Sequence, residues 1–336
     1  MMTGLLDEPL ALTLVAPDGS DLAALPIPPA NFVPYRFGHL HFLHAYVSET
    51  FGELRRLNVT LLHALDAQAL EIASRLAARG LDYVLSVDDL LEDQRPPGRQ
   101  CRALLAESLP IQEMLLRRRL VRPQQVHLLR PGVYQARHTP PSGQPQRLLA
   151  VMATGRYCPP EAFLTALQAF ALLRSQRDDC AFFLADSPEM DHLLRQRAQK
   201  LGLLGDLTFV DRQGQEQLDD IFRSADVLVS PSACNRIDLE LLSAMAAGVP
   251  VVAEGPGVND FIIPDKTALT FPPGDAAQLA GRLAALLNDR ALADGLCANA
   301  LAHLRENHSP ARMVSQLAGL YRSLSQPAPA GTLPAD

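Results

Sequence analysis

Short apolar segments alternate with helix-like segments along most of this chain, and this alternation constrains the fold more than any other feature of the sequence. From Arg147 onward the strand candidates are RLLAVMAT, CAFFLAD, DLTFVD, DVLVSPS and VPVVAEG, with helix-like segments between them. Parallel strands need crossovers long enough to hold a helix, so this rhythm is typical of α/β domains. The second half of the chain is therefore predicted to form a doubly wound parallel sheet.

The first half shows the same alternation less regularly. Its strand candidates are ALTLVAP, NVTLLHAL, DYVLSVDDL and QVHLLRPGV. A helix is predicted from Ala67 to Arg79, with Gly80 ending it. A strand, helix, strand unit of this length favours a right-handed crossover, which predicts a second, smaller parallel sheet.

A stretch rich in Pro, Gly, Ser and Gln, RHTPPSGQPQ, separates the two halves and has no periodic apolar pattern. The predicted organisation is an N-terminal domain over 1–136, a linker over 137–146 and a C-terminal domain over 147–308. The C-terminal domain should end in one long helical stretch from Ala276 to roughly Arg305. A closing helix over 309–325 and a disordered tail over 326–336 are expected to follow.

Composition excludes several classes of function. A net charge of −7 and only 5% aromatic residues argue against nucleic acid as a partner. The five cysteines are scattered and form no CxxC or CxxH pair, so reduced thiols are expected and neither a disulfide framework nor a metal site. No run of 18 uncharged apolar residues occurs, and the first 20 residues lack a basic region before the apolar one, which predicts a cytoplasmic protein. The basic run Arg117 to Arg119 with Arg122 is either a solvated helix end or a peripheral contact with the inner face of a membrane.

Candidate site residues lie where strands of the C-terminal domain end. In parallel α/β sheets the loops at the carboxyl ends of strands hold ligands. Four such loops are GRYCPPEA, SPEM, ACNRID and PGVND. Gly155 and Gly257 would let the backbone approach a ligand, and the Arg156 guanidinium suits a phosphate.

The order of these elements resembles family 4 (group 1) glycosyltransferases. The run from Ala225 to Asp289, which contains VSPSACNRIDLELLSAMAAGVPVVAEGPGVND, looks like the core of their C-terminal domain. TGRYCPPEAFLTALQAFALL resembles the opening of that domain, and SPARMVSQLAGLYRSL resembles the closing helix. A fainter likeness extends the match to roughly residues 59 to 324.

The resemblance implies the GT-B fold, with two Rossmann-like domains facing across a cleft. It also implies retaining transfer of a sugar from a nucleotide-sugar donor to a glycan or lipid-linked acceptor. Such enzymes need no metal or other cofactor, because cationic side chains and a helix N-terminus neutralise the leaving diphosphate. The donor-binding residues carried over are Gly155, Arg156, Ser243, Gly257, Val258 and Asn259.

The family's donor motif is altered in this sequence. Two glutamates separated by seven residues are expected, and Asn235 and Ser243 occupy their positions. Asn235 and the nearby Asp238 are the catalytic candidates, although Asp238 is also placed to stabilise a helix N-terminus.

Three further departures concern the phosphate site and the first domain. Glu161 stands where the family has a lysine, five residues after Arg156, and an acid there would repel a diphosphate unless it points to solvent. The loop over 186–188 is Asp-Ser-Pro where a glycine is common. The first domain is short, and its three histidines, His39, His41 and His44, lie in an apolar, aromatic neighbourhood that is typical of packing residues.

Two hypotheses therefore stay open. One is an active glycosyltransferase; the other is a catalytically impaired relative that serves as a binding or scaffold partner of an active glycosyltransferase. A different Rossmann-type enzyme such as an epimerase is disfavoured, because no GxGxxG follows the first strand.

Overall fold

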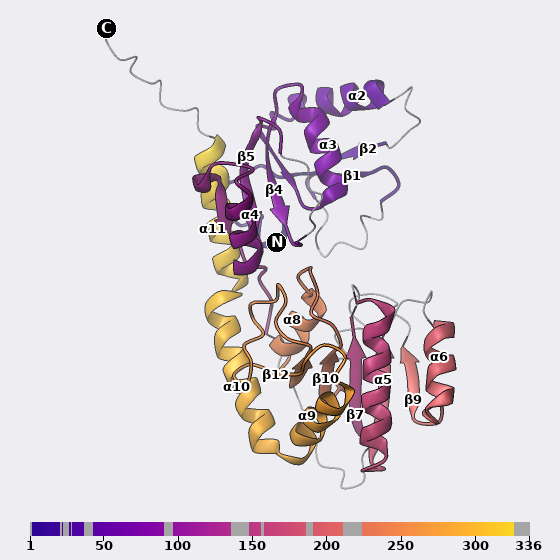
Figure 1. Ribbon diagram of the computed structural model, residues 1–336. Helices are drawn as coiled ribbons and strands as arrows, with labels where there is room; N and C mark the ends of the chain where they lie inside the picture. The colour runs from indigo at the N-terminus through magenta and orange to yellow at the C-terminus, as the bar shows by residue number, and fades with distance from the viewer. Residues whose placement is uncertain are drawn as a thin grey trace. The chain divides into compact units, whose positions relative to one another are not determined.

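The computed structural model describes residues 2–20, 22, 27, 29–36, 43–90, 97–135, 148–155, 158–185, 191–210 and 224–325. The chain divides into two units (Figure 1). Residues up to Gly132, together with those from Pro310 onward, form the first unit, and Val133 to Ser309 form the second. The predicted linker and the loop over 186–188 lie outside the described residues, as do His39 and His41.

The second unit is built on a six-stranded parallel sheet. Its strands are β7 (Leu149–Thr154), β8 (Cys180–Ala185), β9 (Leu207–Val210), β10 (Val227–Ser230), β11 (Val251–Ala253) and β12 (Leu269–Thr270). They lie in the order β12-β11-β10-β7-β8-β9, which is 3-2-1-4-5-6 read from β9. This is the order of doubly wound dinucleotide-binding domains, so the α/β prediction for this half is confirmed.

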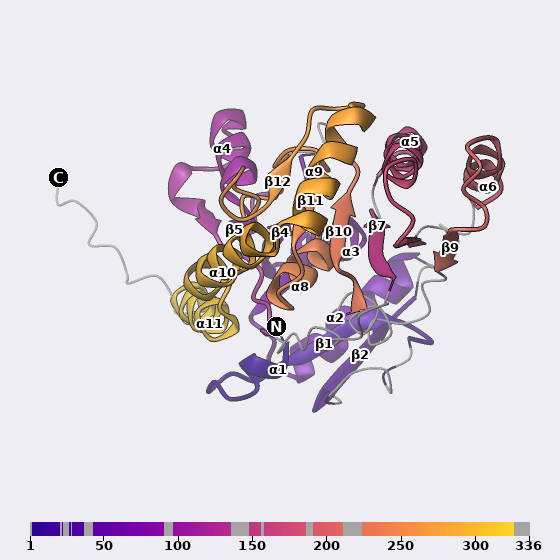
Figure 2. The same cartoon turned by 90° about the horizontal axis from the view of Figure 1, so that it is seen from below.

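Helices cover both faces of this sheet (Figure 2). They are α5 (Pro160–Arg174), α6 (Asp191–Lys200), α8 (Leu239–Ala246), α9 (Ala276–Asn288) and α10 (Arg290–Asn307). Side chains alternate along each strand, so Val227 and Val229 of β10 face the core under α5 and α9, whereas Leu228 faces the core under α8 and α10. The strands are apolar in both directions because both faces are buried.

The helical stretch predicted from Ala276 to roughly Arg305 is helical in the structure, but it is divided into two helices at Asp289. Asp289 ends α9 and caps α10, with its carboxylate accepting a hydrogen bond from the Leu292 N–H at 3.0 Å. Asp289 has extended backbone angles, and a short acidic side chain stabilises a helix start by satisfying one of its free N–H groups. The helix predicted before Ala225 falls on residues that the structure does not describe.

The first unit contains two separate parallel sheets. One is four-stranded, in sequential order: β3 (Leu61–Ala64), β4 (Asp82–Val87), β5 (Cys101–Ala106) and β6 (Val126–Leu128). The other pairs β1 (Thr13–Pro17) with β2 (Asn31–Tyr35). Sequence patterns missed β2 and β5, since NFVPY contains a proline and CRALLA is interrupted by Arg102.

The remaining elements of this unit flank its sheets. They are α1 (Met2–Leu5), α2 (Leu43–Arg56), α3 (Ala67–Ala77), α4 (Leu109–Arg118), the short 3-10 helix η2 (Pro123–Gln125) and α11 (Pro310–Ser325). Helix α3 begins at Asp66, whose carboxylate accepts from the Ala69 N–H at 2.6 Å. None of the helices in the described part of the chain is both long enough and apolar enough to cross a bilayer.

The closing helix α11 packs on the first unit. Leu317 and Ala318 are fully buried in the same apolar cluster as strand residues Val84 and Leu105. Above this cluster, His63 of β3 hydrogen-bonds through Nδ1 to the Tyr321 hydroxyl and through Nε2 to the Ser86 hydroxyl.

Burial lowers the pKa of His63 to about 4, so its imidazole is neutral in the folded chain at pH 7. Burial also raises the pKa of the Tyr321 hydroxyl. Neutral hydrogen bonds thus link helix α11 to strand β3 of the four-stranded sheet.

Candidate functional site

The carboxyl ends of β7 and β10 lie side by side where the strand order of the second unit reverses. Gly155 directly follows β7, the segment from Pro231 to Asp238 follows β10, and the segment from Glu254 to Asn259 follows β11. Open α/β sheets bind ligands at such a reversal, because the two neighbouring loops diverge there and leave a crevice. Three of the four loops predicted from the sequence therefore meet at one end of one sheet.

Asp238 and Asn259 join two of these loops. The Asp238 N–H donates to Asn259 Oδ1 at 2.9 Å, and both residues are almost completely buried. Asp238 Oδ1 also accepts from the N–H groups of Glu240 and Leu241, each at 3.0 Å. The predicted stabilisation of the helix N-terminus by Asp238 is confirmed, and it fixes the start of α8 against the loop after β11.

Gly257 is required by a close contact between loops. It has a φ of 50°, and a Cβ atom there would lie 2.7 Å from the carbonyl oxygen of Cys234. That oxygen accepts a hydrogen bond from the Val258 N–H at 3.4 Å, and the Val258 side chain is fully buried. The absence of a side chain at Gly257 is therefore needed for the approach of the two loops, and the assignment of this exposed residue to the donor stays a prediction from the sequence.

The sequence interpretation missed the partners of two carboxylates. Glu240 is buried and accepts a hydrogen bond from the Thr154 hydroxyl at 3.0 Å, which ties α8 to the end of β7. Glu254 accepts from the backbone N–H groups of Ala233 at 3.0 Å and Gly274 at 3.3 Å. The position of Glu254 directly after β11 could have signalled its role, since strand ends were the basis of the prediction. No sequence signal links Thr154 to a residue so far along the chain.

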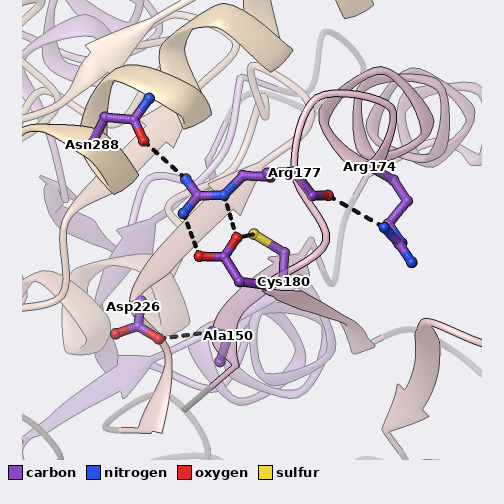
Figure 3. Close-up of polar contacts among 7 residues, drawn as sticks. Ala150, Arg174, Arg177, Cys180, Asp226 and Asn288 are labelled. Carbon is purple, nitrogen blue, oxygen red and sulfur yellow. Dashed lines mark hydrogen bonds and ion pairs between the residues drawn. The ribbon is translucent and has the colours of Figure 1, made fainter. Parts of the chain in front are cut away.

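At the amino ends of the strands, an ion pair and several hydrogen bonds link the loops to the sheet (Figure 3). Arg177 contacts the Asp179 carboxylate through two nitrogens at 2.6 and 2.8 Å, and it donates to Asn288 Oδ1 at 3.2 Å. This pairing lowers the pKa of the Asp179 carboxyl. Asp226 accepts from the Ala150 N–H at 2.7 Å. These contacts hold loops to β7 and to α9, so they stabilise the domain. The carboxyl ends of the strands are therefore the candidate binding region.

Comparison with known families identifies the kind of domain that the second unit forms. Residues 139–303 match the model of the family described as glycosyl transferases group 1. The second unit is a group 1 glycosyltransferase domain. Its match begins in the linker and ends within α10, so it contains every loop described above.

Curated relatives of this chain include sugar transferases from several bacteria. The D-inositol 3-phosphate glycosyltransferase of Streptomyces scabiei is 30% identical over 251 residues, which are 66% of this chain and 54% of the relative. The lipopolysaccharide core biosynthesis mannosyltransferase LpsB of Rhizobium meliloti is 30% identical over 134 residues, 39% of this chain and 38% of the relative. The chain thus spans about half the length, or less, of the curated relatives it matches.

Solved structures confirm the predicted GT-B fold. Sucrose-phosphate synthase from Thermosynechococcus elongatus superposes with a TM-score of 0.75 at 20% identity, over 96% of this chain and 90% of that one. HepE from Anabaena, crystallised in complex with UDP-glucose, gives a TM-score of 0.74 at 18% identity, over 87% of this chain and 86% of that one. This protein is therefore an α/β protein of two Rossmann-like domains.

The remaining residues implied by the family are distributed around the carboxyl edge. Asn235 is exposed, Ser243 is half-buried on α8, and Gly155 is buried at the end of β7. Glu161 is exposed in the first turn of α5, as expected of an ordinary acid at a helix start. Arg156 lies outside the described residues, so its assignment to the donor stays a prediction from the sequence.

Metal ligands do not gather at this edge. Across the residues that the structure describes, no three His, Cys, Asp or Glu side chains are grouped so that they could hold a metal ion. Of the three histidines, the structure describes His44, which lies on α2 of the first unit. Its Nε2 atom lies 3.3 Å from a guanidinium nitrogen of Arg79.

Proposed function

We propose that this chain transfers a sugar, with retention of anomeric configuration, from a nucleotide-sugar donor to a glycan or lipid-linked acceptor. The observation that carries the proposal is the convergence of the loops after β7, β10 and β11 at the strand-order reversal of a group 1 glycosyltransferase domain. A nucleotide is the ligand that this crevice holds in doubly wound folds. The UDP-glucose complex of HepE makes UDP-glucose the first donor to test.

Each predicted donor residue has a chemical task in this proposal. Arg156 would pair with the diphosphate, whose two negative groups suit a planar guanidinium fork. Asn235 is exposed in the loop after β10 and has an amide that can both donate to and accept from sugar hydroxyls. Ser243 would meet the ribose. No metal is required, since cationic and N–H groups can stabilise the charge that develops on the leaving diphosphate.

The second candidate is a catalytically impaired partner of an active glycosyltransferase. Asn235 and Ser243 carry no charge, so they cannot replace the two motif carboxylates. The neighbouring acids already have structural hydrogen bonds: Asp238 caps α8, Glu240 accepts from a buried threonine hydroxyl, and Glu254 accepts from two backbone N–H groups. This occupation favours a site that binds a donor without rapid transfer.

Calorimetric titration with UDP-, GDP- and ADP-sugars, followed by proton NMR of slow donor hydrolysis, tests both candidates. Binding and release of a sugar of unchanged anomeric configuration support the active enzyme. Binding without any sugar release supports the impaired partner. Silence across the whole donor panel would refute a donor site of either kind.

An arginine pair locates the site in the same experiment. Arg156→Ala should weaken binding of the donor by at least about tenfold, because a charge-assisted contact to phosphate contributes about 1.5–3 kcal/mol. Arg290→Ala is the matched control, since Arg290 is an exposed side chain on α10 in a loose ion pair with Asp294. Equal affinity of the two variants would show that Arg156 does not contact the donor.

A further inference from the structure

Two thiols from different loops meet at the carboxyl edge of the second sheet. Cys158 Sγ lies 3.6 Å from Cys234 Sγ, although the residues are separated by 76 positions in the chain. Cys158 follows β7 and is partly exposed, whereas Cys234 follows β10 and is buried. All five cysteines are free thiols in the structure, and this is the pair whose sulfur atoms are in contact.

The backbone around both cysteines is arranged to hold this contact. The Cys158 N–H donates to the Gly155 carbonyl at 3.0 Å, and a side chain on Gly155 would overlap the Cys158 sulfur. The Cys234 thiol lies 3.6 Å from the Ser232 carbonyl, and the Cys234 backbone packs against Gly257. Two glycines therefore make room for two facing cysteines.

The Cys158 thiol is protonated at neutral pH. Hydrogen bonding to Cys234 and burial raise the pKa of the Cys158 thiol well above its usual range. Because the thiolate is the nucleophile in exchange reactions, attack by Cys158 should be slow at pH 7 and faster as the pH rises.

We propose that Cys158 and Cys234 form a modification site, in which a low-molecular-weight disulfide oxidises the pair to an intramolecular disulfide that weakens donor binding. The Cys158 sulfur, which is the more accessible, loses its proton and attacks one sulfur of the oxidant. The S–S bond of the oxidant breaks, and one thiol leaves with a proton. Cys234, once deprotonated, attacks the Cys158 sulfur, breaks the mixed disulfide and releases the second thiol. Two protein thiols are oxidised and one small disulfide is reduced to two thiols.

The effect on the donor follows from the geometry and rests on the function proposed above. A disulfide bond is about 2.05 Å long, so the two sulfur atoms must approach each other by roughly 1.5 Å. Cys158 belongs to the loop that carries Arg156, and Cys234 directly precedes Asn235. A covalent bond between the loops after β7 and β10 would shift Asn235 from its position at the strand-order reversal, and a misplacement of about 1 Å at a reacting centre can lower a catalysed rate by up to ~100-fold.

The test begins with the full chain and oxidised glutathione as the probe, at pH 7 and pH 8.5. Intact mass should fall by two hydrogen atoms, peptide mapping should recover a Cys158–Cys234 cross-link, and formation should be faster at the higher pH. Dithiothreitol should restore the original mass. Cys158→Ser should abolish the cross-link, and Cys297→Ser on α10 is the matched control that should leave it unchanged. Failure to form this cross-link, or cross-linking of other cysteines in its place, would overturn the proposal.

Calorimetry with UDP-glucose on reduced and oxidised chain then measures the consequence. Oxidation should weaken binding by at least about fivefold, as expected for the loss of about one hydrogen bond to the donor. Reduction should restore binding, whereas Cys158→Ser should bind equally before and after oxidant. Equal affinity of the reduced and cross-linked forms would overturn the effect on the donor. If the reduced chain binds no nucleotide sugar at all, the proposed function fails and the effect on the donor fails with it, while the mass measurement still decides the cross-link separately.

Discussion

Replacing Asp238 separates a structural role from a catalytic one. Its carboxylate accepts from the N–H groups of Glu240 and Leu241 at 3.0 Å and is nearly inaccessible to water. Asp238→Ala leaves two buried donors without this acceptor, and it removes an N-cap worth up to about 2 kcal/mol. We expect the free energy of unfolding to fall by about 2 kcal/mol, which corresponds to a decrease in Tm of about 4–8 °C for a domain of this size.

The Asp238→Asn variant is the discriminating control. Asparagine caps helices about as well as aspartate, so unfolding in urea, followed by circular dichroism, should show a loss of no more than about 0.5 kcal/mol. Donor affinity should also be retained, because the carboxylate is committed to backbone N–H groups. A variant with asparagine that is as unstable as the alanine variant would refute the capping argument. A variant that is stable but cannot transfer sugar would instead identify Asp238 as a catalytic acid or base.

Two further predictions concern His63 and Gly257. The folded pKa of His63 is about 4 against an ordinary value of 6.5, so its contribution to stability is complete above pH 6.5 and is lost as the pH falls from 6.5 to 4. Urea unfolding should show about 2 kcal/mol lost by pH 5, and His63→Gln should lose less over the same interval; parallel pH profiles would contradict this. Gly257→Ala should destabilise the second unit by about 1–3 kcal/mol, because its methyl group meets the Cys234 carbonyl, whereas Gly255→Ala has open space and only backbone strain. Thermal unfolding of the two alanine variants measures the difference, and equal Tm values would rule out the clash.

The fold of the second unit was predictable because its strands carry unbroken apolar runs. CAFFLA and VLVS are buried on both faces, and such strands are recognisable without knowledge of their neighbours. The first unit was harder to predict, because β2 contains a proline and the apolar run of β5 is interrupted by Arg102. The break at Asp289 was hidden for another reason: a single capping residue within a long Ala- and Leu-rich stretch does not interrupt its helical periodicity.

The location of the candidate site was also predictable, but its internal contacts were not. Parallel strands bring their carboxyl ends to one edge whatever their order, so loop residues such as Asn235 and Asn259 could be assigned to that edge from strand ends alone. Which side chains then meet depends on the 3-2-1-4-5-6 order, which places β10 next to β7. The Thr154–Glu240 and Cys158–Cys234 contacts both result from that adjacency, and neither has a local signal in the sequence.

Charge at this edge explains why binding and transfer should be considered separately. A glutamate at the position of Asn235 or Ser243 would bring negative charge near a diphosphate, and its benefit to transfer would come from orienting the sugar. Neutral side chains avoid the repulsion between a carboxylate and the diphosphate, but they also lack the carboxylate that would orient the sugar. Asp238 and Glu240 are buried and hydrogen-bonded. Moving Asp238 to the sugar would break the cap of α8, and moving Glu240 would break the contact between α8 and β7. In the donor site that we propose, neutral side chains at Asn235 and Ser243 are therefore compatible with donor binding, and we expect their cost to fall mainly on the rate of transfer.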